Sequence, residues 1–367
     1  MNSYKLWLFC LLLLPCQSKP QSPTTTQPAD EIIFGQSGAF TGHFKMYAHA
    51  IQRGIEACFK QTNKAGGIRG KKLRLVSLDD IGDYARFQKN IQTLRTTFNT
   101  SMFLGLMDTS SILSLLPLMK EGKATVFFPW AQHKELQDPK LTHIVNGPGL
   151  LQPQIEALAK SEDIQAKRIA IFHADDDFST RWAHFLADRL KAEGQTPIAI
   201  ENFNFFTMNV AQTAAELIKK SPKVVLCVCT GTPVVELIKY FFGHGAFSTQ
   251  FFGIDSTFPV KDILKYTGVA FYYSSAVPDP ANSEIKLAQE YRQAMNEFFP
   301  EEPLSILSFT YYLCSRIIVD ALCKAPDESA QAIMQQIENM KKTELGGYPL
   351  DFDPSTRYIF GKKVWII

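Results

Sequence analysis

From Glu31 onward the chain alternates short apolar runs with amphipathic runs, and this pattern constrains the fold more than any other feature. Apolar residues recur at helical spacing between strand-like runs at 31–35 and 72–80, and the same order of strand and helix continues up to the apolar run at 125–129. Strands that are joined through helices favour a parallel sheet with helices on both faces.

The pattern restarts after residue 149 with five more strand-like runs, RIAIFH, IAIENFNF, VVLCVC, QFFGID and AFYYSS, and it becomes mainly helical from Ser283. The chain has 367 residues, of which 46% are apolar, so it is long enough to form two cores. We therefore predict two doubly wound α/β lobes. The two halves share no residue-level repeat, so the expected symmetry is one of architecture alone.

The N-terminus has the features of an export signal. Lys5 precedes an apolar run from Leu6 to Leu14, which is too short to span a bilayer and is followed by Pro15 and Cys16. A lipid anchor at Cys16 and ordinary signal cleavage near Ser18 both remain open. The Pro/Thr/Gln-rich stretch that follows lacks apolar periodicity, so residues 1–29 are expected to be a signal peptide and flexible tether on a periplasmic or exported protein.

Charge and cysteine content exclude several classes of protein. The 38 Lys and Arg nearly balance the 36 Asp and Glu, which leaves no electrostatic basis for binding nucleic acid or an anionic membrane. Five cysteines remain after the signal, and an odd number cannot be a complete disulfide framework. Cys227 and Cys229 are spaced for one face of a strand, which favours buried thiols over a zinc or redox motif.

No convincing catalytic or metal motif is present. Gly243 and Gly245 lack the third glycine of a dinucleotide-binding turn, and neither a phosphate-binding loop nor a nucleophile elbow occurs. Three consecutive acids at 175–177 would point in divergent directions, so a solvated loop is favoured over a metal cluster. We predict a protein that is not an enzyme and that has neither a metal nor a cofactor.

Polar residues follow several presumed strands at the sheet edge where α/β proteins bind ligands. Thr109 and Ser110 follow one strand and begin a helix, where hydroxyl and amide groups can hold a carboxylate. Asp255 follows a strand of the second unit and could bind an ammonium group. Ordinary helix caps are the alternative for all three residues. Aromatic residues that could wall a cleft or belong to the core are Tyr47, Trp130 and Phe178.

Residues 32–80 resemble the opening of the periplasmic leucine/isoleucine/valine-binding protein family, the type I solute-binding proteins of ABC transporters. The resemblance rests on two spaced glycines before a long helix, a tyrosine at its start, an N-x-x-G-G-I-x-G-x-x-L motif and an acidic pair. The matching residues are Gly35, Gly42, Tyr47, Gly54, Asn63, Gly66, Gly67, Ile68, Gly70, Leu73, Asp79 and Asp80.

The resemblance implies two lobes joined by a three-strand hinge that close on a small ligand. It assigns Thr109 and Ser110 to a ligand carboxylate and Asp255 to an ammonium group. Several positions depart from the family pattern. Gln132 stands where a hydroxyl residue is usual, and Thr232 replaces an aromatic residue. Trp130 replaces a small residue, and Phe178 stands where a tyrosine is usual. The implied pocket is completed by Tyr47, Trp130 and Phe178.

The implied organisation places residues 30–146 and 277–347 in lobe 1, and residues 147–276 and 348–367 in lobe 2. The chain is then expected to cross between the lobes near Val145–Pro148, Ser274–Pro278 and Gly347–Leu350. The expected function is capture of an amino acid or related small carboxylate or amide by a monomer that delivers it to an ABC permease. A ligand-sensing protein and an exported enzyme remain as alternatives.

Overall fold

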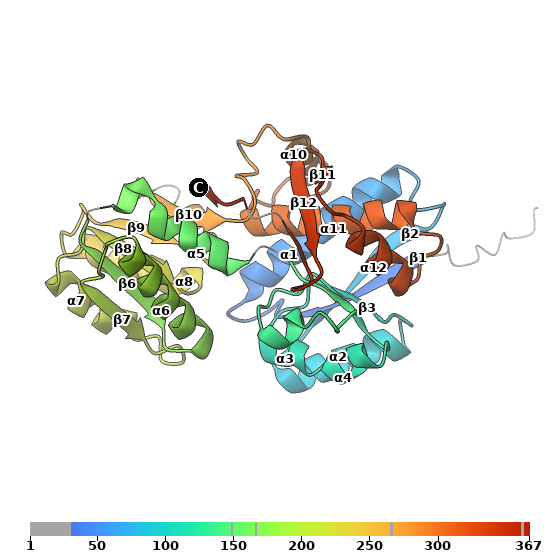
Figure 1. Cartoon of the computed structure of the whole chain (residues 1–367), viewed down its shortest axis with the longest axis horizontal. Helices are drawn as coiled ribbons and strands as arrows, with labels where there is room; N and C mark the ends of the chain where they lie inside the picture. The colour runs from blue at the N-terminus through green and yellow to red at the C-terminus, as the bar shows by residue number, and fades with distance from the viewer. Residues whose placement is uncertain (1–30, 148–149, 166, 265–266, 361–362) are drawn as a thin grey trace, which may run out of the picture.

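The computed structural model describes residues 31–147, 150–165, 167–264, 267–360 and 363–367, and it contains two α/β bodies (Figure 1). The predicted signal peptide and tether lie outside the described residues. The first body, called lobe 1 below, is built on a five-stranded parallel sheet. Its strand order is β2 (Lys72–Asp79), β1 (Glu31–Gly38), β3 (Met102–Leu104), β4 (Thr125–Phe127) and β5 (Ile144–Val145).

Helices cover both faces of this sheet, as the sequence predicts. One face is covered by α1 (Lys45–Lys64) and α11 (Ile306–Lys324), with α10 (Lys286–Phe298) packed on both of these helices and α12 (Ala330–Glu338) packed on α11. The other face packs against α2 (Tyr84–Thr96), α3 (Thr109–Leu113) and α4 (Leu116–Lys120).

Helix α11 is long and apolar enough to cross a membrane by composition, but 83% of its apolar window is buried within the protein. It packs closely along α1, because Gly54 of α1 offers no side chain where the two backbones meet. A Cβ atom at this position would lie 2.0 Å from the carbonyl oxygen of Ser308. The match between Gly54 and the family pattern therefore has a packing reason.

The second body, lobe 2, is built on a six-stranded sheet. Its strand order is β14 (Trp365–Ile366), β10 (Phe271–Ser275), β9 (Gln250–Gly253), β8 (Val224–Val228), β6 (Ile169–Ala174) and β7 (Ala199–Phe203). All neighbours are parallel except β14, which is antiparallel to β10. The helices of this lobe are α5 (Leu151–Lys160), α6 (Asp177–Ala192), α7 (Val210–Lys219), α8 (Gly231–Gly243) and α9 (Pro259–Leu264).

A third, three-stranded antiparallel sheet lies near the passages between the lobes. It consists of β11 (Thr343–Leu345), β12 (Tyr348–Asp353) and β13 (Tyr358–Phe360). Short 3-10 helices complete the described elements: η1 (Lys134–Gln137), η2 (Glu162–Ile164) and η3 (Asp255–Thr257).

The chain leaves the first sheet after β5 and leaves the second after β10. The third crossing differs from the prediction. Residues 348–360, predicted to belong to lobe 2, are tied to lobe 1: Tyr358 bridges Asn146 beside β5, and the Arg357 guanidinium donates to the Ile144 carbonyl at 3.1 Å. Only β14 joins the second sheet, so the chain returns to lobe 2 after Phe360.

Candidate functional site

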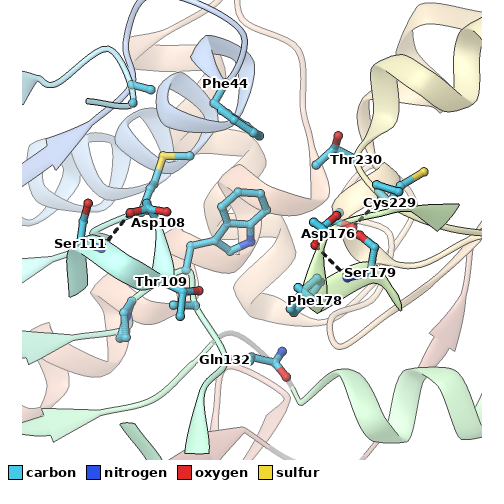
Figure 2. A pocket seen from close by; sticks show the side chains of 18 of the residues that line it. Phe44, Asp108, Thr109, Ser111, Gln132, Asp176, Phe178, Ser179, Cys229 and Thr230 are labelled. Atoms are coloured by element: carbon cyan, nitrogen blue, oxygen red, sulfur yellow. Dashed lines mark hydrogen bonds between the residues drawn. The ribbon is translucent and has the colours of Figure 1, made fainter. Parts of the chain in front are cut away.

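A cavity of about 370 Å³ lies between the two lobes. Most of its walls come from the segments that follow the carboxyl ends of β1, β2, β3 and β4 in lobe 1 and of β6, β7, β8 and β9 in lobe 2. Figure 2 shows Asp108, Thr109 and Gln132 of lobe 1 facing Asp176 and Thr230 of lobe 2 across this space. Two parallel sheets thus direct their ligand-binding edges toward one cavity.

On the lobe 1 side, Asp108 takes the N-cap position of α3 with a φ of 71°. Its carboxylate accepts hydrogen bonds from the Ser111 amide at 2.8 Å and the Ser110 hydroxyl at 2.7 Å. Thr109 lines the cavity, whereas Ser110 is not part of the lining. The Asp108 carboxylate therefore already accepts from the Ser110 hydroxyl, which was predicted to bind a ligand carboxylate.

On the lobe 2 side, Asp176 caps α6 by accepting from the Ser179 amide at 2.9 Å, and Phe178 follows it with 38% of its surface exposed. At the next strand, Cys229 and Thr230 line the cavity, but Thr232 does not. Burial raises the pKa of the Cys229 thiol well above its usual value, so the thiol is protonated at neutral pH. Among the five cysteines in the described part of the chain, only Cys323 is exposed.

Asp255 is a lining residue on the lobe 2 side of the cavity, at the start of η3 directly after β9. Its carboxylate accepts from the Gln154 side-chain amide at 2.8 Å, and Gln154 is completely buried in α5. Burial raises the pKa of Asp255 to about 6, against the opposing effect of hydrogen bonds from Gln154 and the Ser256 amide. Asp255 is thus an ionisable group whose protein partners are all neutral.

Two predicted residues connect the lobes. The Tyr47 hydroxyl donates to the Ser256 carbonyl at 2.9 Å and accepts from the Gly231 amide at 2.8 Å, so a lobe 1 helix is bonded to lobe 2. The Tyr47 ring is buried and stacks on Trp130 with centroids 5.0 Å apart, and Trp130 rather than Tyr47 lines the cavity. Gln132 accepts from the Leu151 amide of α5 at 3.3 Å.

The structure therefore gathers five of the eight predicted site residues around one cavity: Thr109, Trp130, Gln132, Phe178 and Asp255. Tyr47, Ser110 and Thr232 lie outside the lining. Several other lining residues are not predicted from the sequence to bind ligand, including Phe44, Asp80, Asp83, Asp108, Asp176 and Thr230. Three of these acids are helix N-caps that follow strands, a position that in itself indicates the ligand-binding edge.

No group of three or more metal-binding side chains occurs among the described residues. The neighbouring acids Asp175 and Asp176 bind different backbone groups. Asp175 accepts from the Phe205 amide at 2.8 Å, whereas Asp176 caps α6.

A family model described as periplasmic binding protein matches residues 31–361. The chain belongs to this family. Members of the family are extracytoplasmic solute-binding proteins, and the family is not one of enzymes. The resemblance seen in the sequence is thereby confirmed.

Similar proteins agree with this assignment. A Leu/Ile/Val-binding protein homolog 7 of Brucella abortus is 20% identical over 89% of this chain and 86% of its own length. A crystal structure of a possible leucine/isoleucine/valine-binding protein from Rhodopirellula baltica has a TM-score of 0.81, 22% identity and coverage of 92% and 94%. A solute-binding protein of an ABC transporter from R. palustris, solved with 4-hydroxybenzoate, has a TM-score of 0.76, 14% identity and coverage of 92% of each chain.

These structures confirm the predicted fold of two α/β lobes. Solute-binding proteins of this type differ in the ligands that they bind. The ligand class of this periplasmic binding protein therefore depends on the residues of its own cavity.

Proposed function

We propose that this protein captures a small organic molecule with a protonated amino group, such as an amino acid or a related amide, between its two lobes. The observation that supports this most strongly is Asp255, a carboxylate in the cavity wall whose hydrogen-bond partners are neutral. A buried carboxylate gains most from a ligand that supplies the missing positive charge. An ammonium group would both donate hydrogen bonds to Asp255 and lower its raised pKa.

The remaining walls suit the apolar part of such a ligand. Trp130 and Phe178 would contact it from opposite lobes, and Thr109 and Gln132 would supply hydrogen bonds that fix its orientation. We assign Ser110 and Thr232 to supporting positions beside the lining, and Tyr47 to a contact that holds the lobes together. We propose that the ligand leaves the site chemically unchanged, in keeping with a family of solute-binding proteins rather than enzymes.

We further propose that the closed protein is recognised by an ABC permease and acts as an exported monomer. A ligand that contacts both lobes favours the closed arrangement, because its differential affinity sets the equilibrium between the two forms. Delivery of labelled ligand to proteoliposomes that contain a permease encoded beside this protein would support transport. Retention of ligand without any uptake would favour a sensing role.

The ligand-binding proposal is tested by measuring the melting temperature of the purified protein with α-amino acids, amino amides, amines and carboxylates. A ligand well above its dissociation constant should raise the melting temperature by mass action. Asp255→Asn should weaken binding of ammonium ligands by about tenfold or more, since about 1.4 kcal/mol corresponds to a factor of ten. It should leave neutral ligands unaffected.

Asp188→Asn is the matched control. Asp188 lies on α6 of the same lobe with 69% of its side chain exposed, outside the cavity lining. If both substitutions weaken binding equally, or if ammonium ligands bind the Asp255→Asn protein as well as the unchanged protein, Asp255 is not the anchor.

A further inference from the structure

The lining of the cavity carries charge of one sign only. Five acidic residues line it, Asp80, Asp83, Asp108, Asp176 and Asp255, and both lobes contribute. None of the lining residues is lysine, arginine or histidine. A ligand that enters this space is therefore surrounded by negative charge that the walls do not offset.

The hydrogen-bond partners of these carboxylates are uncharged. Asp80 accepts from the Ser37 hydroxyl at 2.7 Å, Asp83 from the Arg86 backbone amide at 2.8 Å, and Asp108, Asp176 and Asp255 from the neutral groups described above. None of the five forms an ion pair with a cationic side chain in the described part of the chain. The pKa of Asp80 is raised, chiefly by burial and further by Asp79 and Asp108, as expected in a region of negative potential.

Helix N-termini, the usual binding sites for a ligand carboxylate in an α/β cleft, are already engaged by the protein. Acidic side chains cap α2, α3 and α6. Amides at the start of α8 and α5 donate to Tyr47 and Gln132. A carboxylate on the ligand would have to compete with these groups and would approach the capping acids.

Aromatic rings complete the walls. Phe44 and Trp130 come from lobe 1, and Phe178 and Phe205 from lobe 2. The face of an aromatic ring attracts cations through its quadrupole, and the attraction grows when the cation is desolvated. Rings and carboxylates together form a lining that stabilises positive charge on an apolar body.

We infer that the cleft selects organic cations, namely ammonium groups on an apolar or aromatic body without a free carboxylate, over zwitterionic amino acids and carboxylic acids. This inference rests on the proposed function, because it names the ligand class of the same cavity. A zwitterion would bring one more negative charge among five carboxylates with no cationic side chain to pair with it. An amine brings only the charge that the walls favour.

The test compares ligands that share one body and differ in charge. Isothermal titration at pH 7.5 would use phenethylamine, phenylalanine and 3-phenylpropionate, and then isoamylamine, leucine and 4-methylpentanoate. The amine of at least one set should bind at least about tenfold more tightly than its zwitterion, and the carboxylate should bind most weakly. Higher ionic strength should weaken binding of the amine.

Charge-neutralising variants separate selection by charge from support of the fold. Asp108→Asn and Asp176→Asn keep a good helix cap, and asparagine also tolerates the positive φ at position 108. Each substitution should weaken the binding of phenethylamine by about three- to tenfold, while the affinity for 3-phenylpropionate should be unchanged or higher. A purely structural role would weaken all ligands together, and Asp188→Asn should alter none.

The outcomes distinguish the inference from the function on which it rests. Tighter binding of phenylalanine or leucine than of the matching amines would overturn cation selection and leave amino-acid capture in place. Equal loss of amine and carboxylate binding in Asp108→Asn would also contradict it. Failure of all six probes to bind at millimolar concentration would reject both proposals.

Discussion

At the scale of single residues, the cavity contains groups that function requires and folding does not. Asp255 is the clearest case, because burial raises its pKa to about 6 while the protein supplies only neutral partners. A carboxyl group with a raised pKa in the folded state destabilises that state when it ionises. Such a cost is typical of binding sites that are completed only by the ligand.

The raised pKa of Asp255 makes the stability of the ligand-free protein depend on pH. The unfolded chain releases the Asp255 proton near pH 4 and the folded chain near pH 6, so this residue lowers the free energy of unfolding as pH rises between those values. Asp255→Asn removes the effect. Urea unfolding should therefore show the variant to be about 1–2 kcal/mol more stable than the unchanged protein at pH 7.5 and similar to it at pH 4. A less stable variant at pH 7.5 would contradict this account.

Residue types and their order could locate the site only in part. Asp255, Thr109 and Trp130 were predicted because they follow strands whose carboxyl ends meet at one edge. Asp108 lies in the same segment, but an aspartate there is equally typical of a helix cap and of a cavity wall, so its role in the cavity could not be predicted from the sequence. Tyr47 shows the opposite limit, because its partners at Gly231 and Ser256 lie about two hundred residues away in sequence and in the other lobe.

At the scale of elements, the contact between α1 and α11 organises lobe 1. Gly54→Ala would place a Cβ atom 2.0 Å from the Ser308 carbonyl oxygen, and backbone on both sides must move to relieve this. Overpacking in a well-packed core costs about 1–3 kcal/mol, and more when backbone is the obstacle. Urea unfolding should show a loss of at least about 2 kcal/mol, or a protein that fails to fold.

Gly243→Ala provides the matched control for this prediction. Gly243 is the last residue of α8, and a Cβ atom there would meet nothing within 4 Å. Alanine is a better helix former than glycine, so this variant should be as stable as the unchanged protein or more stable by about 0.5–1 kcal/mol. Similar losses in both variants would show that the helix contact is not the cause.

The assignment of elements to lobes was predictable where it follows local pattern. Each parallel strand is joined to the next by a helix with its own apolar face, so the two sheets followed from the sequence. The attachment of β13 to lobe 1 could not be predicted in this way. It depends on Arg357, which is 4% exposed and bonds to carbonyl groups of residues 142 and 144, and a pairing so distant leaves no local pattern.

At the scale of the whole molecule, two lobes that share a cavity must have contacts that set how firmly they close. Tyr47 supplies such a contact, with one hydroxyl bonded to Gly231 and Ser256 of lobe 2 and a ring stacked on Trp130 of lobe 1. Gln132 of lobe 1 adds a second interlobe bond by accepting from the Leu151 amide, and chain passages connect the two bodies (Figure 1). A small number of interlobe bonds can therefore shift the equilibrium between open and closed forms.

Tyr47→Phe tests this role without disturbing the cavity lining, because the ring is kept and only the hydroxyl is lost. The substitution leaves a buried amide and a carbonyl unpaired in the closed form, which costs about 1–3 kcal/mol, whereas opening exposes both groups to water. Ligand affinity should therefore fall about five- to a hundredfold, and small-angle scattering should show a larger radius of gyration than for the unchanged protein at the same ligand concentration. The free energy of unfolding of the open, ligand-free protein should change by less than about 1 kcal/mol. Unchanged affinity with an unchanged radius of gyration would mean that closure is governed elsewhere, and the passages beside Gly147 and Phe360 would then be the next positions to vary.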